Sequence, residues 1–214
     1  MKNHLVELLK DSSIELDSSV FSESAAEDLL LYLTEWERWN AKINLTAESD
    51  ALSVANKHIY ESLQYTRAIA STGSLVDVGS GAGFPGIPVK IILPKLEIML
   101  IESQRKRANF LKTAIHSIGL SKIQCVHGRA EDFPAFVGKY DFVTLRHVLE
   151  PHLSLQLGAS LLHPGGSLIL QTSRENSFQF DFLDSLWLSP VDEIFFKRSS
   201  SSHSKIMVFK RNSS

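Results

Sequence analysis

The chain has 214 residues, of which 43% are hydrophobic and 21% are charged, and its formal net charge is −2. These values exclude a disordered or fibrous chain, and no apolar run is long enough to cross a bilayer, so we expect a soluble, cytoplasmic protein without a membrane partner. The single cysteine, Cys125, excludes an intrachain disulfide, and no histidine spacing points to a metal.

The first seventy residues predict a helical segment. Helices are expected over residues 3–10, 22 to about 39, and 51–70, because apolar side chains recur there at helical spacing. Residues 1–57 carry five Lys or Arg against eleven Asp or Glu, whereas the rest of the chain carries seventeen against thirteen. An acidic segment on a mildly basic remainder permits a polyanionic substrate.

From residue 75 onward, strands and helices alternate. The expected strands cover residues 75–78, 97–101, 123–126, 140–145, 167–171, 193–197 and 205–210. The expected helices cover residues 88–93, 105–118 and 151–162. Such alternation predicts an α/β fold, a mostly parallel seven-stranded sheet with helices on both faces and an antiparallel ending. We therefore divide the chain into a helical N-terminal extension, residues 1–70, and a cofactor-binding domain, residues 71–214.

The most informative segment is a glycine-rich turn that follows the first expected strand. It reads Val76-Asp77-Val78-Gly79-Ser80-Gly81-Ala82-Gly83-Phe84-Pro85-Gly86. Glycines allow positive φ angles and let a ligand lie against bare main chain. The helix after the turn offers unpaired N–H groups and the positive end of its dipole. The turn is therefore a candidate site for a nucleotide-like cofactor.

Two cofactors are compatible with this turn. Gly81-x-Gly83-x-x-Gly86 matches the dinucleotide fingerprint. Asp77-x-Gly79-x-Gly81-x-Gly83 looks like the first motif of Rossmann-like methyltransferases that use S-adenosylmethionine (SAM). A carboxylate at Asp77 would repel a pyrophosphate but attract the ammonium group of methionine. Pro85 interrupts the helix opening that should cradle a pyrophosphate. The sequence therefore favours SAM, with NAD(P) as the alternative.

Acidic residues follow the next two expected strands. Glu102 ends the second strand, about twenty residues beyond the glycine turn, where a carboxylate can accept both ribose hydroxyls of an adenosine. The third strand leads into Ala130 and Glu131, where a backbone N–H and an acidic side chain could meet an adenine edge. Glu102 supports a cofactor site but does not by itself separate SAM from NAD.

Several segments together carry a family resemblance. They are, in order, Trp39-Asn40-x-x-x-Asn44-Leu45-Thr46, His58-x-x-x-Ser62-Leu63, the glycine turn extended to Gly86-Ile87-Pro88, Glu102-Ser103-x-x-Lys106-Arg107-x-x-Phe110-Leu111, Arg129-Ala130-Glu131 and Asp141-x-Val143-x-x-Arg146. In this combination the chain resembles the bacterial small-subunit (16S) ribosomal RNA guanine-N7 methyltransferases, methyltransferase G, also called the glucose-inhibited division protein B family. That family has the class I SAM-dependent methyltransferase fold with a helical N-terminal extension.

The resemblance implies roles for individual positions. Four residues of the turn would lie against the methionine and ribose moieties of SAM, namely Gly79, Gly81, Gly83 and Phe84. Glu102 would hold the ribose, and Ala130 and Glu131 the adenine. Arg146 would lie at the edge of the cofactor site, near the incoming base. The implied partner is 16S ribosomal RNA or the small ribosomal subunit, with no obligate protein partner.

The chain departs from the family pattern at three places. The usual Asp-Ser is here Glu61-Ser62, and the usual Ala after Arg146 is here His147. The strand after Pro164-Gly165-Gly166 commonly ends in Lys-Gly and here ends in Gln171-Thr172. If that lysine contacts RNA phosphate, its role is missing here or passes to Arg174, which bears on substrate affinity more than on cofactor binding.

RNA would need a cationic surface beside the cofactor site. Arg105, Lys106 and Arg107 form the densest basic cluster after residue 70 and are our tentative RNA contacts, with a solvated helix start as the alternative explanation.

The expected reaction requires little of the protein's own chemistry. Guanine N7 carries an in-plane lone pair and needs no deprotonation before it attacks a sulfonium methyl group, so we assign no catalytic residue. Three alternatives stay open: a SAM-dependent enzyme acting on a small molecule or protein, an NAD(P)-dependent oxidoreductase, and a noncatalytic SAM-binding module.

Overall fold

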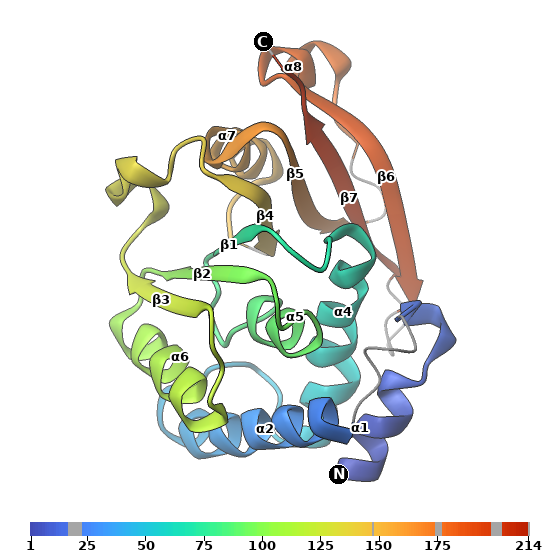
Figure 1. Ribbon diagram of the computed structural model, residues 1–214, viewed down its shortest axis with the longest axis vertical. Coiled ribbons are helices and arrows are strands. Elements are labelled where there is room, and N and C mark those ends of the chain that lie inside the picture. The colour runs from blue at the N-terminus through green and yellow to red at the C-terminus, as the bar shows by residue number, and fades with distance from the viewer. Residues whose placement is uncertain (17–22, 147, 174–176, 198–202, 214) are drawn as a thin grey trace.

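A seven-stranded sheet forms the centre of the molecule, with strand order β3-β2-β1-β4-β5-β7-β6 (Figure 1). The computed structural model describes residues 1–16, 23–146, 148–173, 177–197 and 203–213. The strands are β1 (Ser74–Val78), β2 (Glu97–Glu102), β3 (Ile123–His127), β4 (Tyr140–Arg146), β5 (Leu162–Ser173), β6 (Leu188–Lys197) and β7 (His203–Arg211). The predicted fold class, a mostly parallel sheet with helices on both faces, is confirmed.

Strand direction sets the position of the site. β1 pairs in parallel with β2 and β4, and the parallel pairing continues outward to β3 on one side and β5 on the other. β7, inserted between β5 and β6, pairs antiparallel with both. The loops that follow β1, β2, β3 and β4 therefore open on one edge of the sheet, where α/β proteins bind ligands.

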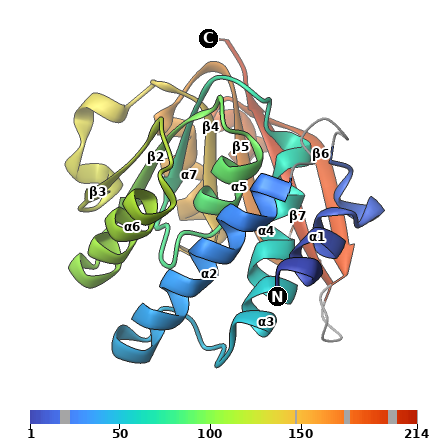
Figure 2. The ribbon, with the colours of Figure 1, turned by 60° about the horizontal axis from the view of Figure 1, so that its bottom comes forward.

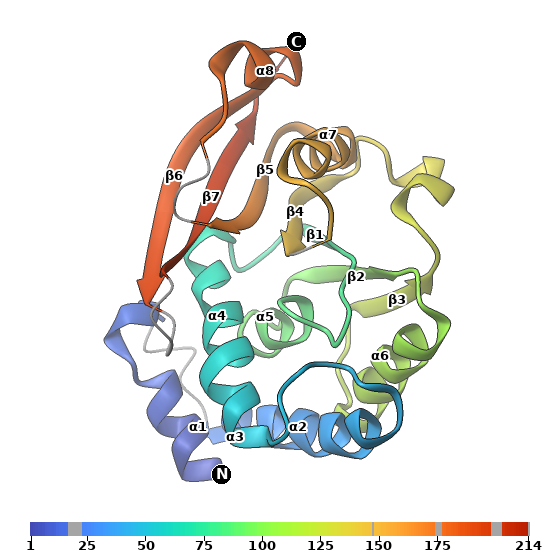
Figure 3. The same cartoon turned by 180° about the vertical axis from the view of Figure 1, so that it is seen from behind.

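Most helices cover one face of the sheet. They are α1 (Lys2–Leu9), α2 (Glu23–Ile43), α3 (Ala51–Val54), α4 (Tyr60–Gln64), α5 (Gly86–Ile92) and α6 (Arg105–Ile118). Figure 2 shows α2, α4 and α5 in front of the strands, and Figure 3 shows α4 beside α5 from behind. Their apolar side chains form one cluster that runs from Leu5 of α1 to Leu75 of β1 and Val208 of β7. The N-terminal helices and the sheet therefore share a hydrophobic core.

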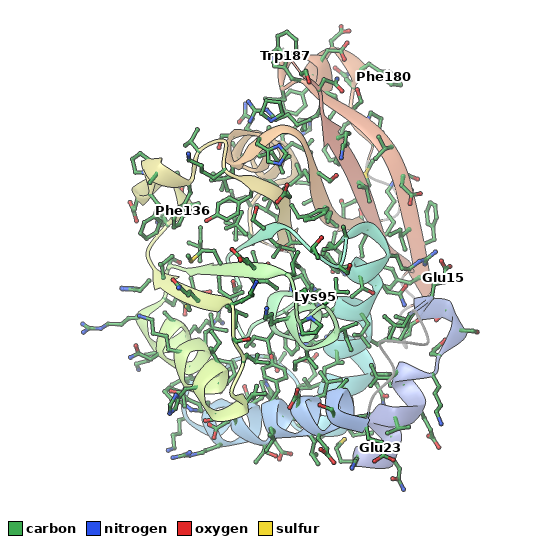
Figure 4. The ribbon with its side chains drawn as sticks, viewed as in Figure 1. Glu15, Glu23, Lys95, Phe136, Phe180 and Trp187 are labelled. Atoms are coloured by element: carbon green, nitrogen blue, oxygen red, sulfur yellow. The ribbon has the colours of Figure 1, made fainter. Side chains whose placement is uncertain are left out.

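The opposite face is covered by α7 (Pro151–Leu161) and α8 (Phe180–Ser185). A second cluster holds Val76, Val78, Val143 and Leu155 there. Leu75 and Val76 belong to different clusters because successive strand side chains point to opposite faces. At the tip of the α8–β6 end, Phe180 and Trp187 point outward into solvent (Figure 4).

The helix expected over residues 51–70 is interrupted. Its middle, Ala55–Ile59 (η3), is π-helical, and its end, Tyr65–Ala68 (η4), is 3₁₀. Apolar periodicity predicts the helix but does not distinguish a π turn, which adds one residue to one turn. Three shorter departures follow: β5 begins at Leu162 rather than at 167, β6 begins at Leu188 rather than at 193, and α8 was not expected. The predicted start of the second helix, Ser22, and Arg174 and His147 lie outside the described residues.

Candidate functional site

The glycine turn connects β1 to α5 through a tightly bonded loop. Gly79, Gly81 and Gly83 all adopt positive φ, at 68°, 58° and 93°. The N–H groups of Gly79 and Ser80 donate to the carbonyl of Ile101, at 2.8 and 3.1 Å. Those of Gly83 and Phe84 donate to the carbonyl of Ser80, and that of Gly81 donates to Glu102 Oε2 at 2.8 Å.

These bonds discriminate between the two candidate cofactors. A dinucleotide pyrophosphate needs free N–H groups in the glycine turn and at the start of the next helix. Here the amides of residues 79–81, 83 and 84 already have acceptors inside the protein, and Gly86 N, at the start of α5, donates to Asp77 Oδ2 at 3.3 Å. The geometry therefore favours a cofactor without a pyrophosphate.

Asp77 lies beneath the turn rather than in a cavity. It is 1% exposed, and its carboxylate accepts hydrogen bonds from Thr144 Oγ1, at 2.8 Å, and from Gly86 N. Burial raises the pKa of Asp77 to about 6, against the opposing effect of these hydrogen bonds. Asp77 therefore holds the turn in place, and its carboxylate lines neither of the cavities described below.

One cavity on the ligand-binding edge is lined by both apolar and polar residues. Its volume is about 210 Å³, and it is lined by Val78, Gly79, Ile101, Ser103, Gly128, Arg129, Ala130, Glu131, Val148, Leu149 and Leu157. Apolar side chains there offer faces for a flat ring, while Glu131 and the 128–130 backbone offer polar groups at the ring edge. This first cavity suits an adenine.

Glu102 is bonded to the glycine turn next to the first cavity. Its side chain is buried, and Oε2 accepts the Gly81 N–H while Oε1 accepts the Gln104 N–H at 2.7 Å. Each carboxylate oxygen can accept a second hydrogen bond. Glu102 itself lines neither cavity, whereas Ile101 and Ser103 on either side of it line the first.

A second cavity lies on the other side of the turn. Its volume is about 260 Å³, and it is lined by Leu45, Thr46, Ala47, Glu48, Lys57, His58, Gly79, Ser80, Gly81, Ala82, Phe84, Arg107 and Arg146. Gly79 lines both cavities, so a ligand that bridges them would cross its bare backbone. The helical N-terminal segment supplies the outer wall of the second cavity, through residues 45–48 and η3.

Arg146, at the end of β4, is held by a buried polar network. Its Nε donates to Gln171 Oε1 at 2.9 Å, and its Nη2 donates to His58 Nδ1 at 2.9 Å and to Glu61 Oε2. Gln171 also bonds Glu61, at 3.3 Å from Nε2 to Oε2. The guanidinium lies 5.9 Å from the ring centroid of Phe84. Gln171, one of the departures from the family pattern, thus contacts Arg146.

The arrangement around His58 fixes its tautomer. Because Nδ1 accepts from Arg146, the ring proton resides on Nε2, which donates to Glu48 Oε2 at 2.6 Å. Burial and the charge of Arg146 lower the pKa of His58 to about 4, so the ring is neutral at pH 7. Although burial opposes it, hydrogen bonds from Lys57 and His58 lower the pKa of Glu48 to about 2.

Helix α2 fixes the other end of the glycine turn. The fully buried Tyr32 donates its hydroxyl hydrogen bond to the carbonyl of Ala82. Its ring packs edge-on against Phe84, with centroids 5.6 Å apart. The N-terminal helices therefore contact the turn directly as well as through the core.

The predicted site residues are partly brought together. Gly79, Gly81, Phe84, Ala130, Glu131 and Arg146 line one or both cavities. Gly83 and Glu102 line neither cavity: a Cβ at Gly83 would lie 2.7 Å from Ile87 Cδ1 in the core, and the Glu102 carboxylate is bonded to the turn. Of the basic cluster, Arg107 lines the second cavity, whereas Arg105 and Lys106 are exposed on the first turn of α6.

The buried network around Arg146 and His58 was not predicted from the sequence. Glu48, His58, Glu61 and Gln171 come from three separate segments, and no spacing in the sequence relates them. His58 and Glu61 are three residues apart on one helical surface, which is the only signal that could have linked two of them.

The residues present fit SAM. The two cavities meet at Gly79, an apolar slot with a carboxylate beside it matches adenosine, and Arg146 offers a cation for the methionine carboxylate. Within the described ranges, no three His, Cys, Asp or Glu side chains gather where they could hold a metal ion. In the same part of the chain, no helix has both the length and the apolar character needed to cross a membrane.

Solved structures share this fold. The chain superimposes on TYW2 from P. horikoshii in complex with MeSAdo with a TM-score of 0.59 and 16% identity, over 72% of this chain and 62% of that one. It superimposes on TrmN from Thermus thermophilus with a TM-score of 0.55 and 19% identity, over 72% and 48%. At this level of identity the likeness establishes the fold of class I methyltransferases and nothing more specific.

Sequence relatives are more informative. A protein from Desulfitobacterium hafniense named ribosomal RNA small subunit methyltransferase G is 40% identical over 143 residues, which cover 65% of this chain and 59% of the relative. The protein of the same name from Streptococcus pyogenes serotype M2 is 38% identical over 163 residues, 73% of this chain and 69% of the relative. The model of the GidB family, described as rRNA small subunit methyltransferase G, matches residues 25–189, so the chain belongs to that family of SAM-dependent methyltransferases.

Proposed function

We propose that this protein transfers a methyl group from SAM to N7 of a guanine in 16S ribosomal RNA, either free or within the small ribosomal subunit, in the bacterial cytoplasm. The observation that carries the proposal is the pair of cavities meeting at Gly79, one suited to adenosine and the other, beside Arg146, open to the methionine moiety and an acceptor base. The names of the relatives supply the substrate class.

In the proposed reaction, guanine N7 takes the methyl group directly from the sulfonium, and the protein contributes by positioning the two. When bound, SAM supplies an electrophilic methyl group on a sulfonium. The protein's task is to align the N7 lone pair with that methyl group, and alignment of this kind can contribute on the order of 7–11 kcal/mol. No general base is needed, because N7 carries no proton. Positive charge develops on the base during transfer, and the ionised carboxylate of Glu48 in the second cavity favours it.

The helical extension, residues 1–70, and the cofactor-binding domain, residues 71–214, would act together. The adenosine half of the site comes from the loops after β1, β2, β3 and β4, whereas the acceptor half is closed by residues 45–48, Lys57 and His58 of the extension. Tyr32 joins the two parts at the carbonyl of Ala82.

Methyl transfer from isotope-labelled SAM tests the proposal directly. The acceptors are 16S RNA and small subunits, both isolated from a strain that lacks this modification. Mass spectrometry of the digested nucleosides should reveal labelled 7-methylguanosine, and borohydride–aniline cleavage would locate it in the RNA. A different labelled nucleoside would contradict the N7 assignment.

The two acceptors separate free RNA from the assembled particle. Transfer to small subunits alone would make the particle the substrate. If the protein binds SAM and labels neither acceptor, the substrate assignment fails and the alternative, a SAM-dependent enzyme with a small-molecule or protein acceptor, replaces it. That outcome would also implicate Gln171, the residue that departs from the family pattern next to Arg146.

A further inference from the structure

The side chain of Arg146 belongs both to the buried network and to the lining of the second cavity. Three of its five N–H donors are occupied, one by Gln171, one by His58 and one by Glu61. The two N–H groups of Nη1 have no hydrogen-bonding partner within the described ranges. Since Arg146 lines the second cavity, Nη1 is the part of the guanidinium available to a ligand.

The buried network alone could hold Arg146 in an orientation that keeps Nη1 out of the second cavity. Glu61 is a carboxylate whose side chain is 1% exposed, and a guanidinium prefers to meet a carboxylate with two parallel N–H groups. If nothing else held Nη2, rotation toward Glu61 would bring Nη1 into that pair and withdraw it from the cavity. The acceptor that competes with such rotation is His58 Nδ1, at 2.9 Å from Nη2.

His58 is itself held rigidly. Its ring stacks on Phe84, with centroids 4.9 Å apart and planes 22° apart. Glu48 accepts the Nε2 proton on the opposite edge of the ring, which leaves the Nδ1 lone pair directed at Arg146. Glu48 is in turn anchored, since Asn40 Nδ2 donates to its backbone carbonyl at 3.1 Å and Lys57 pairs with its carboxylate. The chain of contacts runs without interruption from the N-terminal extension to β4.

We propose that His58 is a positioning residue: oriented by Glu48, it holds the guanidinium of Arg146 so that Nη1 faces the second cavity and binds the carboxylate of the methionine moiety of SAM. The inference rests on the proposed cofactor but not on the identity of the methyl acceptor. It gives the helical extension a part in cofactor affinity as well as in closing the acceptor half of the site.

A double-mutant cycle on SAM affinity tests this coupling. His58→Phe keeps a stacking ring and removes the acceptor, and Arg146→Ala removes the guanidinium. Calorimetric titration of SAM into the four proteins should show about a tenfold loss for His58→Phe, equivalent to ~1.4 kcal/mol. The double variant should bind no more weakly than Arg146→Ala alone. Additive losses would overturn the inference, because His58 would then act independently of Arg146.

Two further variants separate positioning from folding. His58→Asn places an amide oxygen near the position of Nδ1 and should restore most of the affinity that His58→Phe loses. His163→Phe is the matched control: His163 also bonds a carboxylate, Asp141, at 2.7 Å, but lies outside both cavities. It should leave SAM affinity unchanged. Equal losses in His58→Asn and His58→Phe would contradict the acceptor role.

The tautomer provides a readout that needs no cofactor. In long-range ¹H–¹⁵N spectra of the protein alone, the His58 signals, assigned by their loss in His58→Asn, should show a protonated Nε2 and an unprotonated Nδ1 at pH 7. A protonated Nδ1 would overturn the inference. If the wild-type protein binds SAM but methylates no RNA, the proposed acceptor fails and the cycle still decides the role of His58. If it binds no SAM, both proposals fail.

Discussion

Gly81 holds a left-handed backbone conformation at the mouth of the second cavity. A Cβ at this position would meet only the carbonyl oxygen of Gly79, at 3.8 Å, so space exists for a side chain where the ligand is expected. We predict that Gly81→Leu abolishes SAM binding in a calorimetric titration, because the leucine fills the cavity.

The control for Gly81 is another glycine with the same backbone requirement. Gly119, at the end of α6, has a φ of 79° and no atom near its missing Cβ. Gly119→Leu should carry a similar cost of left-handed backbone, about 1–2 kcal/mol, and keep SAM affinity. If Gly81→Leu still binds SAM as the wild type does, the site is elsewhere.

The buried carboxyl group of Asp77 should make the free energy of unfolding depend on pH in an unusual way. Its pKa is about 6 in the folded protein because of burial, against an ordinary value of 3.8. Between these values the folded protein holds a proton that the unfolded chain has lost, so the contribution of Asp77 to stability falls as pH rises. In Asp77→Asn, the amide oxygen can accept from Gly86 N and the amide can donate to Thr144. The free energy of unfolding of the variant, relative to that of wild type, should therefore rise by on the order of 2 kcal/mol as the pH rises from 4 to 7.

Urea unfolding of both proteins at pH 4 and pH 7 measures this difference. A constant difference across that range would contradict the assignment to Asp77. The sequence placed this aspartate correctly at the end of β1 but could not reveal its burial. Whether a carboxylate lies in a cavity or beneath a turn depends on Thr144, a residue 67 positions away.

The glycines of the turn likewise show that the sequence motif does not predict the role of each single residue. In sequence, Gly79, Gly81 and Gly83 are equivalent members of one motif. In the structure Gly81 faces open space, Gly83 faces Ile87 and Leu111 in the core, and Gly79 lies against Val148. The spacing predicts that the chain turns there, whereas the role of each glycine depends on what packs against it from other segments.

Among the elements of the extension, α2 contacts the glycine turn through Tyr32. We predict that Tyr32→Phe, which leaves the Ala82 carbonyl without its hydroxyl donor, lowers the free energy of unfolding by about 1 kcal/mol and weakens SAM binding. The reason for the second effect is that the turn loses the contact that fixes its outer end. Chemical denaturation and SAM titration measure the two effects separately.

Tyr60 provides the matched control for Tyr32. Its hydroxyl bonds Ser13 Oγ at 3.0 Å, outside both cavities, so Tyr60→Phe should leave SAM affinity unchanged. Equal SAM affinity in Tyr32→Phe and wild type would show that the core alone supports the turn.

Elements with strong local signals were predicted well. The bounds of α6 match the prediction because the helix ends at Gly119, whose left-handed conformation stops it. β5 was predicted too short, since Pro164-Gly165-Gly166 is typical of a turn. The strand nevertheless begins at Leu162, which pairs with Tyr140 across a bulge. Pairing with a distant strand overrides local turn preference there.

For the whole molecule, the basic start of α6 should contribute to RNA binding. Arg105 and Lys106 are exposed at the same edge of the sheet as the two cavities, and Arg107 lines one of them. We predict that the double variant Arg105→Ala/Lys106→Ala binds RNA more weakly than wild type. The plot of log RNA affinity against log salt concentration should become less steep, its negative slope shrinking in magnitude by about 1–2. SAM affinity should not change. Filter binding over a series of salt concentrations measures the slope.

A second double variant controls for net charge. Lys95→Ala/Lys112→Ala removes two exposed cations that lie outside both cavities. It should leave the slope nearly as in wild type. Equal effects of the two double variants would show that RNA responds to overall charge, and the basic cluster would then be an ordinary solvated helix start.

The shared core has a consequence for how the chain is made. Leu5 of the first helix and Val208 of the last strand belong to one hydrophobic cluster, so contacts in this core span almost the whole sequence. During synthesis the N-terminal helices leave the ribosome long before β7, the strand that completes their core, exists. Contacts of such long separation form slowly. Since α2 packs on α5 and α6, the apolar face of the first helices stays uncovered on the nascent chain at least until those helices are translated.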